Sequence, residues 1–241
     1  MKFDSWLTHQ IKVDSWTIAE ISDYIKLKKN QHFATCKLDY RDDKSANFVG
    51  LRYVNTQVTY KLLRDDNVSI KPRDKKITRL IEMSEELLNE FSSVFYHDRF
   101  SVDKELPPSF SKTIKRAWIK EALEGKNNRE IYGYLDLDRK VNAFCIIERS
   151  EKKMWRIDLI GVLPTAQGKG LSKKLTSSML SYCGGDIIVG TQEDNIISNN
   201  LYKSYPHEIL SRKFVYHLSL IHISEPTRPE RIAYAVFWVK K

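Results

Sequence analysis

The sequence predicts an α/β protein built on a mixed β-sheet with helices on both faces. The first observation is the order of segments after residue 74: two amphipathic helices, three strands, a helix, a strand, a helix and two strands. The second is a strand, a glycine-containing loop and a helical run between Ile157 and Tyr182. Antiparallel strands followed by a strand–helix–strand crossover are typical of a mixed sheet covered on both sides.

Residues 1–68 are expected to form a first domain. Helical spacing covers Ile18–Ile25, and strand-like runs occupy Phe33–Leu38 and Val54–Leu63, the second being rich in β-branched residues. The charged, proline-containing segment Arg64–Asp74 is interpreted as a linker that enters the second domain.

Residues 69–217 are expected to form the second, catalytic domain, which begins with two helices. Apolar residues over Ile77–Phe91 follow helical spacing, and this helix is expected to end near Phe95. A loop with two prolines leads to an amphipathic helix over Phe110–Leu123. Gly125 ends that helix, because glycine readily adopts the left-handed conformation of a C-cap.

The rest of the second domain is interpreted as strands, with helices at two places. The expected strands and the final hairpin are Ile131–Leu137, Val141–Glu148, Met154–Val162, Asp186–Thr191, His207–Leu210 and Arg212–His217. The helices run over Leu171–Tyr182 and Ile197–Tyr205.

Composition excludes several classes of protein. Hydrophobic residues make up 41% of the chain, which favours a packed core over disorder. Apolar runs fall short of the roughly 20 residues that span a bilayer, and the N-terminus lacks an apolar signal core, so we expect a cytoplasmic protein without a membrane partner. The three cysteines are far apart, which argues against a metal site and a disulfide framework.

The net charge of +9 permits binding to an anion. The basic residues are scattered among acidic ones, so we interpret most of them as solvated and expect no nucleic-acid partner.

The stretch Ile157–Ser172 carries the strongest functional signal. Pro164 ends its strand, and the loop Gln167-Gly168-Lys169-Gly170 leads into a helix. Unpaired N–H groups and the helix dipole make such a helix start a binding site for anions, and Lys169 adds a positive charge. An ordinary strand–loop–helix connection remains the alternative.

These residues resemble motif A of the GNAT superfamily of acetyl-CoA-dependent N-acyltransferases, Arg/Gln-x-x-Gly-x-Gly/Ala. The chain has Gln167-x-x-Gly170-x-Ser172, and Ser172 departs from the last position. The resemblance implies the GNAT fold. It also implies that the loop, from Gln167 through Gly168, Lys169, Gly170 and Leu171 to Ser172, holds the coenzyme A pyrophosphate. Backbone groups around Ile160 and Val162 would hold the pantetheine arm.

A second segment resembles the GNAT signature Asn-x-x-Ala-x-x-Leu-Tyr, with Asn195, Ser198, Leu201 and Tyr202 at its positions. The resemblance implies that Tyr202 protonates the leaving thiolate and that Asn195 contacts the coenzyme arm. A tyrosine pKa near 10 suits that role, since a thiol has a pKa of about 8.5. A packing tyrosine on an amphipathic helix is the alternative for Tyr202.

The general base stays open between two residues. Asp158 is a carboxylate within an apolar strand, where it is a candidate base or a solvent-facing residue. His97 lies in the loop between the first two helices and is the other candidate. His97, Arg99 and Trp118 are expected to contact the acceptor or to be structural.

The runs YHDRFSVDKELP and WIKEALEG resemble the dTDP-fucosamine acetyltransferase group within the superfamily. The run KLDYRDDKSANFVGLRYVNTQVTYKLL resembles the first domain of the same group, which implies a degenerate half-GNAT unit in residues 1–68. The resemblance also implies a dTDP-linked amino-deoxy sugar as the acceptor. The rival acceptors are a peptide N-terminus, an amino acid or a polyamine. The rival class is a non-catalytic module that binds coenzyme A or nucleic acid. No metal is expected, and a homodimer is left open.

Residues 218–241 are interpreted as a non-native tail. The run LSLIHISEPTR over Leu218–Arg228 is identical to one reading frame of a transposase sequencing adapter, and Ile232–Lys241 resembles the flow-cell primer that follows it. We therefore expect the native sequence to end near His217, and the alternative is a genuine terminal strand pair. The tail is given no functional role.

Overall fold

The computed structural model describes residues 1–18, 32–39, 51–64, 74–149 and 154–219 of the chain. Its strands form one sheet in the order β1-β2-β3-β10-β4-β9-β8-β7-β6-β5. The strands are β1 (Lys2–Phe3), β2 (Asp14–Ile18), β3 (His32–Asp39), β4 (Arg52–Leu62), β5 (Ile77–Arg79), β6 (Arg129–Leu135), β7 (Val141–Arg149), β8 (Trp155–Val162), β9 (Ile187–Gln192) and β10 (His207–Ser219). The helices are α1 (Ser5–Ile11), α3 (Glu85–Ser92), α4 (Ser109–Leu123), α5 (Leu171–Cys183) and α6 (Ile196–Lys203), with short 3-10 turns at Lys126–Asn128 and Pro164–Ala166.

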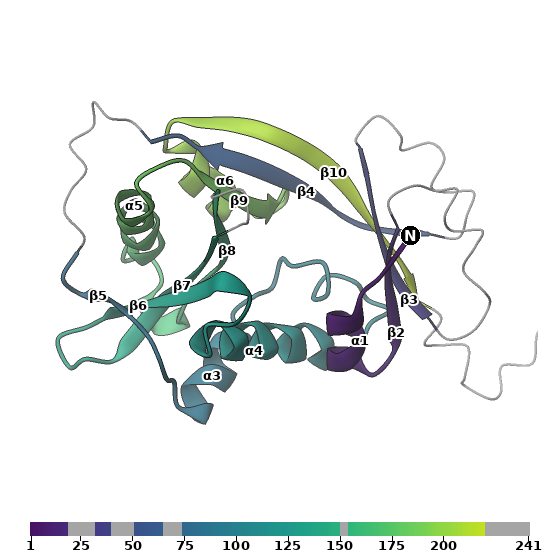
Figure 1. Cartoon of the computed structure of the whole chain (residues 1–241), viewed down its shortest axis with the longest axis horizontal. Coiled ribbons are helices and arrows are strands. Elements are labelled where there is room, and N and C mark those ends of the chain that lie inside the picture. Colours follow the sequence, from purple (N-terminus) through teal and green to yellow (C-terminus); the bar gives the residue numbers. More distant parts are fainter. Residues whose placement is uncertain (19–31, 40–50, 65–73, 150–153, 220–241) are drawn as a thin grey trace, which may run out of the picture.

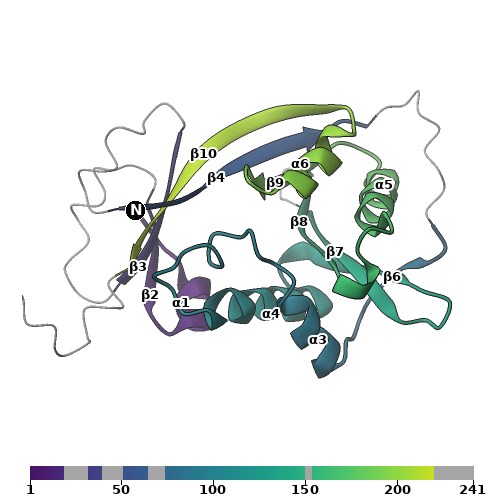
Figure 2. The same cartoon turned by 180° about the vertical axis from the view of Figure 1, so that it is seen from behind.

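Helices cover both faces of the mixed sheet, as the sequence predicts (Figures 1 and 2). On one face α3 packs against β7, where the Phe91 and Phe144 rings are 4.8 Å apart. On the other face α5 buries Leu175 and Met179. The segment just after α6 packs beside α5, since the Tyr205 hydroxyl lies 2.9 Å from that of Ser177. The core therefore lies on both sides of the central strands.

β4 lies between β9 and β10, although it belongs to the predicted first domain. Val58 pairs with Thr191 of β9 on one side and with Arg212 of β10 on the other. Figure 1 shows β4 and β10 as a long curved pair that passes over α4 and the loop before it. The sheet thus includes strands from both sides of the expected domain boundary at residue 68. The division into two domains at that position stays a prediction.

β8 and β9 part along their length. Their parallel pairing covers Trp155–Ile157 and Ile187–Val189, whereas β8 continues to Val162. Asp158 sits at an irregularity on the other edge of β8, because the register with β7 shifts there. The described β8 backbone beyond Ile157 is therefore unpaired toward β9, and this separation opens the central sheet.

The expected helix over Ile77–Phe91 is wrong in its first half. Ile77–Arg79 is strand β5, and α3 begins at Glu85 after Ser84, whose hydroxyl accepts a bond from Leu87 N at 3.2 Å. Leu80 is buried against Gly133, but Ile81 is 78% exposed. The apolar spacing of this stretch therefore reflects strand burial and one exposed isoleucine.

The expected final hairpin is also wrong. β10 is one strand that pairs with β3 and β4 at once, and a bulge between Ile209 and Ser211 produces the apparent break. It continues to Leu218, opposite Ala34, and to Ser219. Residues 220–241 lie outside the described residues, so the origin of the tail stays a prediction.

Ile18, where a helix was expected to begin, is the last residue of β2, and residues 19–25 lie outside the described part of the chain. Helix α4 matches its prediction, and Gly125 after it has φ 68°.

Candidate active site

A cavity of about 940 Å³ lies where β8 and β9 part. Its walls come from β8, β9, α4, α6, the loop before α5 and the loop between α3 and α4. Among the predicted site residues, those that line it are Asp158, Ile160, Val162, Gln167, Gly168, Gly170, Leu171, Ser172, Asn195, Tyr202, His97, Arg99 and Trp118. The fold therefore places residues from both motifs and from the loop before α4 around one space.

The glycine loop forms one end of the cavity. Gly168 and Gly170 have φ of 76° and 70°, a conformation that costs other residues energy, and no heavy atom lies within 4 Å of a Cβ built at either position. Backbone geometry, and not crowding, therefore requires glycine here. Helix α5 starts at Leu171 with no side-chain cap, so its first N–H groups are available to an anion. These residues fit a pyrophosphate.

Two side chains of this loop bond to its own backbone. Gln167 donates from Nε2 to the carbonyl of Val162 at 3.3 Å. Lys169 donates from Nζ to the carbonyl of Thr165 at 3.0 Å, and it is not among the described residues that line the cavity. The contact of Lys169 with the coenzyme stays a prediction.

Tyr202 lies in the cavity wall from α6. Its side chain is buried, and burial raises the pKa of Tyr202. The raised pKa keeps the hydroxyl protonated at neutral pH, which is the form that an acid needs. Asn195 caps α6, because its Oδ1 accepts a bond from Ser198 N at 3.1 Å. Helix capping alone thus accounts for the asparagine, and its contact with the coenzyme stays a prediction.

Two carboxylates from neighbouring strands meet in the cavity. Asp158 accepts a bond from Arg129 Nε at 2.8 Å. Glu148 of β7 hydrogen-bonds Asp158, and burial followed by the charge of Asp158 raises the pKa of Glu148. Sequence reasoning missed Glu148. The available signal was a carboxylate at the end of the apolar run AFCII.

The loop between α3 and α4 forms the other wall. Asp98 is buried there and accepts bonds at 2.6 Å from the hydroxyls of Ser101 and Ser111. Buried Lys115 has its Nζ 3.8 Å from Asp98 and 4.4 Å from the centre of the Trp118 ring. Trp118 thus packs on a cation and faces the cavity.

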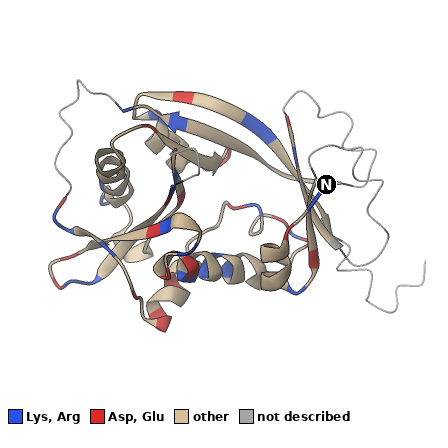
Figure 3. Ribbon diagram, viewed as in Figure 1, with Lys and Arg blue, Asp and Glu red and all other residues tan. Residues whose placement is uncertain are grey.

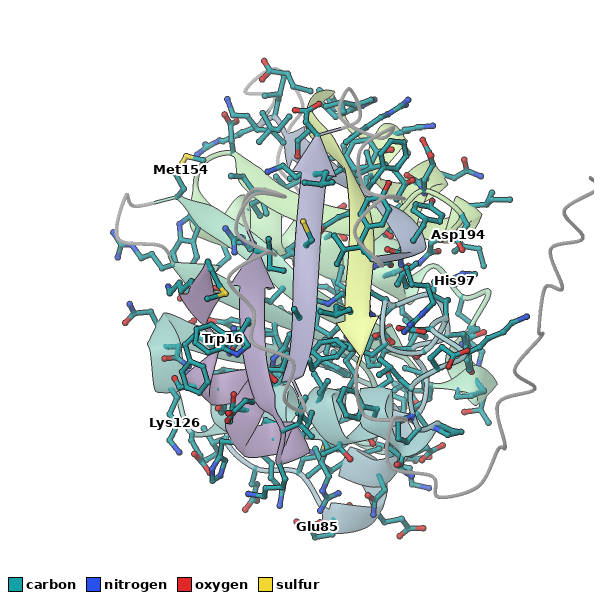
Figure 4. The ribbon with its side chains drawn as sticks, turned by 90° about the vertical axis from the view of Figure 1, so that its right-hand side faces the viewer. Trp16, Glu85, His97, Lys126, Met154 and Asp194 are labelled. Atoms are coloured by element: carbon teal, nitrogen blue, oxygen red, sulfur yellow. The ribbon has the colours of Figure 1, made fainter. Side chains whose placement is uncertain are left out.

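His97 projects from the same loop toward α6. Its Nδ1 lies 3.9 Å from Oδ2 of Asp194, and both side chains are partly exposed (Figure 4). The structure does not bring His97 to Asp158, the other candidate base, through any described contact.

A partly buried network of Arg52, Asp103 and His217 anchors the loop to the sheet. Asp103 accepts bonds from Arg52 Nη2 on both of its oxygens, at 2.8 and 2.7 Å, and lies 2.8 Å from Nδ1 of His217. His217 Nε2 is buried without a partner in the described structure, so the ring is neutral and donates from Nδ1. Burial lowers the pKa of His217 to about 4.

The described residues hold no group of three or more His, Cys, Asp or Glu side chains arranged to bind a metal ion. None of the helices that the structure describes has the length and apolarity needed to cross a membrane.

A strand pair that parts beside a glycine loop and a helix start defines a fold of the acyl-coenzyme A N-acyltransferase class. The chain matches the acetyltransferase (GNAT) family over residues 81–205, and it belongs to this family.

Solved structures agree with this fold. A GCN5-related N-acetyltransferase from Sphaerobacter thermophilus is similar at a TM-score of 0.52 and 13% identity, covering 83% of this chain and 64% of its own. A functionally unknown conserved protein from Staphylococcus epidermidis is similar at a TM-score of 0.58 and 11% identity, covering 86% and 84%. No curated protein matches the chain. The chain thus spans less than two thirds of the Sphaerobacter protein.

Proposed function

We propose that the chain is an acetyl-CoA-dependent N-acetyltransferase that acts on the amino group of a nucleotide-linked amino-deoxy sugar. One observation carries the proposal: Tyr202 lines the same cavity as the Gly168–Gly170 loop and the acceptor-side residues Arg99 and Trp118. This arrangement suits direct transfer between two bound substrates, because both reacting groups occupy one space.

Coenzyme A binds with its pyrophosphate at the start of α5 and its pantetheine arm along β8. The backbone of β8 at Ile160 and Val162, which does not pair with β9, supplies hydrogen-bonding groups for the arm. N–H groups at this edge also polarise the thioester carbonyl, and they need no rearrangement to do so because the strand is fixed.

The acceptor amine loses its proton to the Glu148–Asp158 pair. Within the pair, Glu148 has the raised pKa, and Asp158 is held by Arg129. A carboxylate with a raised pKa is a better base near neutral pH. The amine attacks the thioester carbon, the C–S bond breaks, and Tyr202 gives its proton to the thiolate.

The nature of the acceptor follows from charge and from resemblance. The acceptor side of the cavity includes the cations Lys37, Arg99 and Lys213, which attract an anionic nucleotide and repel a polyamine. The runs around His97 and Trp118 resemble the dTDP-amino-sugar group. Together these favour a nucleotide sugar over the rival acceptors.

The test is release of free thiol from acetyl-CoA. The full chain is mixed with acetyl-CoA and a panel that contains a dTDP-4-amino-4,6-dideoxyhexose, a peptide, an amino acid and spermidine. Turnover on the nucleotide sugar supports the proposal. Turnover on another amine alone overturns the acceptor, and acetyl-CoA binding without any turnover overturns the catalytic role.

A further inference from the structure

Four cations line the cavity and come from four separate parts of the chain. They are Lys37 of β3, Arg99 of the loop before α4, Arg156 of β8 and Lys213 of β10. The proposed acid–base chemistry uses none of them. Figure 3 shows basic residues on β10 and on α4, which lie on opposite sides of that loop.

The strand register puts Lys37 and Lys213 side by side. Lys37 pairs with Val215 of β10, and Lys213 lies two residues before Val215. Residues two apart on a strand share a face, so the two lysines are diagonal neighbours on one face of the sheet.

The same face continues across the sheet to Arg156. Lys213 pairs with Gln57 of β4, which pairs with Gln192 of β9. Ile188 shares its face with Gln192, since four residues separate them, and it pairs with Arg156 of β8. Three cations thus project from one face of the sheet toward the loop that carries Arg99.

Carboxylates near these cations stay outside ion-pair distance in the described residues, although the charges of Asp98 and Asp4 act on Arg99. Among the described residues, none of the four takes part in an ion pair, whereas the other cavity cations Lys115 and Arg129 pair with Asp98 and Asp158. Glu148 lies opposite Arg156 but hydrogen-bonds Asp158. Like charges held together without counter-charge are costly, unless an anion binds among them.

The surrounding positive charges change the pKa of Lys37. Burial, and then the positive charges of Arg99, Lys213 and Arg156, lower the pKa of Lys37 to about 7. All three neighbours are therefore close enough to disfavour its protonated form. A bound anion would restore that form.

The pyrophosphate of coenzyme A does not reach this cluster from the glycine loop. Arg156 stands near the start of β8 and Val162 at its end, six residues apart. At about 3.3 Å per residue that separation is about 20 Å, and the glycine loop begins beyond Val162.

We propose that Lys37, Arg99, Arg156 and Lys213 form a subsite for the phosphate or diphosphate group of the acceptor. The two arginines offer planar forks that suit phosphate oxygens, and the lysines add point charges. The inference rests on the proposed function for its placement of the acceptor, and it adds the position of the acceptor's anionic group. The amino group then lies on the side of the Glu148–Asp158 pair.

Calorimetric titration tests the subsite with two probes, inorganic pyrophosphate and dTDP. The full chain is first saturated with coenzyme A, which occupies the cofactor end. We expect both probes to bind, and Lys37→Gln and Lys213→Gln each to weaken binding about tenfold, the usual scale for loss of one charge-assisted contact. Lys112→Gln is the matched control, because Lys112 is exposed on α4 and does not line the cavity.

Lys213 is exposed, so we expect Lys213→Gln to keep the fold, and unchanged binding in this variant overturns the subsite. Loss of probe binding once coenzyme A is present assigns the anion to the cofactor end and also overturns it. Thiol release in the same samples separates the two proposals. Turnover of the nucleotide sugar with a KM that neither variant changes refutes the subsite alone, and absence of acetyl-CoA binding refutes the proposed function.

Discussion

Arg129 donates to Asp158 across 2.8 Å, and Asp158 in turn lies beside Glu148. Burial, and then the charge of Asp158, raise the pKa of Glu148, so Glu148 holds a proton more readily than an ordinary glutamate. In the proposed mechanism, Asp158 supplies negative charge and Glu148 exchanges the proton.

Replacing each carboxylate should change the pH profile in a different way. Glu148→Gln should lower kcat about 100-fold, the lower end of the usual range for loss of a general base. Asp158→Asn should move the acidic limb of kcat/KM to lower pH, because removing its negative charge lowers the pKa of Glu148. The measurement is kcat/KM against pH for both variants. A full-activity Glu148→Gln beside an inactive Asp158→Asn would return the role of base to Asp158.

Tyr202→Phe should lower kcat about 100-fold and leave the acetyl-CoA dissociation constant nearly unchanged. The ring fills the same space, and only the proton donor is lost. Tyr205→Phe is the matched control, since Tyr205 lies on the same side of the sheet but bonds to Ser177 and to the carbonyl of Lys173. Thiol-release assays give kcat, and calorimetry gives the acetyl-CoA dissociation constant. Equal rates for both variants would make Tyr202 a packing residue.

Gly170→Ala should weaken acetyl-CoA binding about tenfold. Alanine at φ 70° costs about 1 kcal/mol or more, so the loop shifts away from the geometry that presents its N–H groups. Gly185→Ala is the control, because Gly185 has no positive φ and no atom within 4 Å of an added Cβ. Calorimetric titration with acetyl-CoA checks both variants. Wild-type affinity in Gly170→Ala would remove the loop from the cofactor site.

Acid should destabilise the protein through His217. Its folded pKa of about 4 lies below the ordinary value of 6.5, so between these pH values the unfolded chain binds the proton and the folded chain does not. The free energy of unfolding should fall as pH drops through this window, by at most about 3 kcal/mol. Asp103, whose pKa is lowered by His217 and Arg52, extends the loss below the ordinary aspartate pKa.

Urea unfolding at a series of pH values measures this effect. His217→Gln keeps a donor for Asp103 but cannot titrate, and it should flatten the dependence between pH 4 and 6.5. His9→Gln, at an exposed position of α1, should leave it unchanged. The same slope in both variants would show that another group governs acid stability.

The local sequence pattern predicts those parts of the fold whose conformation depends on residues close together in the chain. The strand, loop and helix over Ile157–Ser172 were predictable because proline, glycine and apolar spacing each report backbone conformation directly. The strand β5 was missed because Ile77, Leu80 and Ile81 have helical spacing, and only the contact of Leu80 with Gly133 reveals the strand. α1, over Ser5–Ile11, was missed because it is too short to show a period.

Contacts between residues that are far apart in the chain could not be predicted from the sequence. Glu148 became a candidate only when β7 and β8 placed it beside Asp158. The surplus of positive charge around Lys37 arises from four separate elements, and scattered basic residues along a chain give no sign of it. Sequence spacing therefore predicted the glycine-loop end of the cavity better than the end lined by Lys37 and Arg99.

The insertion of β4 between β9 and β10 has a consequence for the order of folding. The pairing of Val58 with Thr191 joins residues far apart in the chain, and closing such a loop is slow. Until β4 docks, β9 and β10 expose unpaired edges that invite association with other chains. A fragment that starts after β4 would keep the glycine loop and Tyr202 yet present those edges permanently. The early part of the chain thus covers strand edges in the half that carries the cavity.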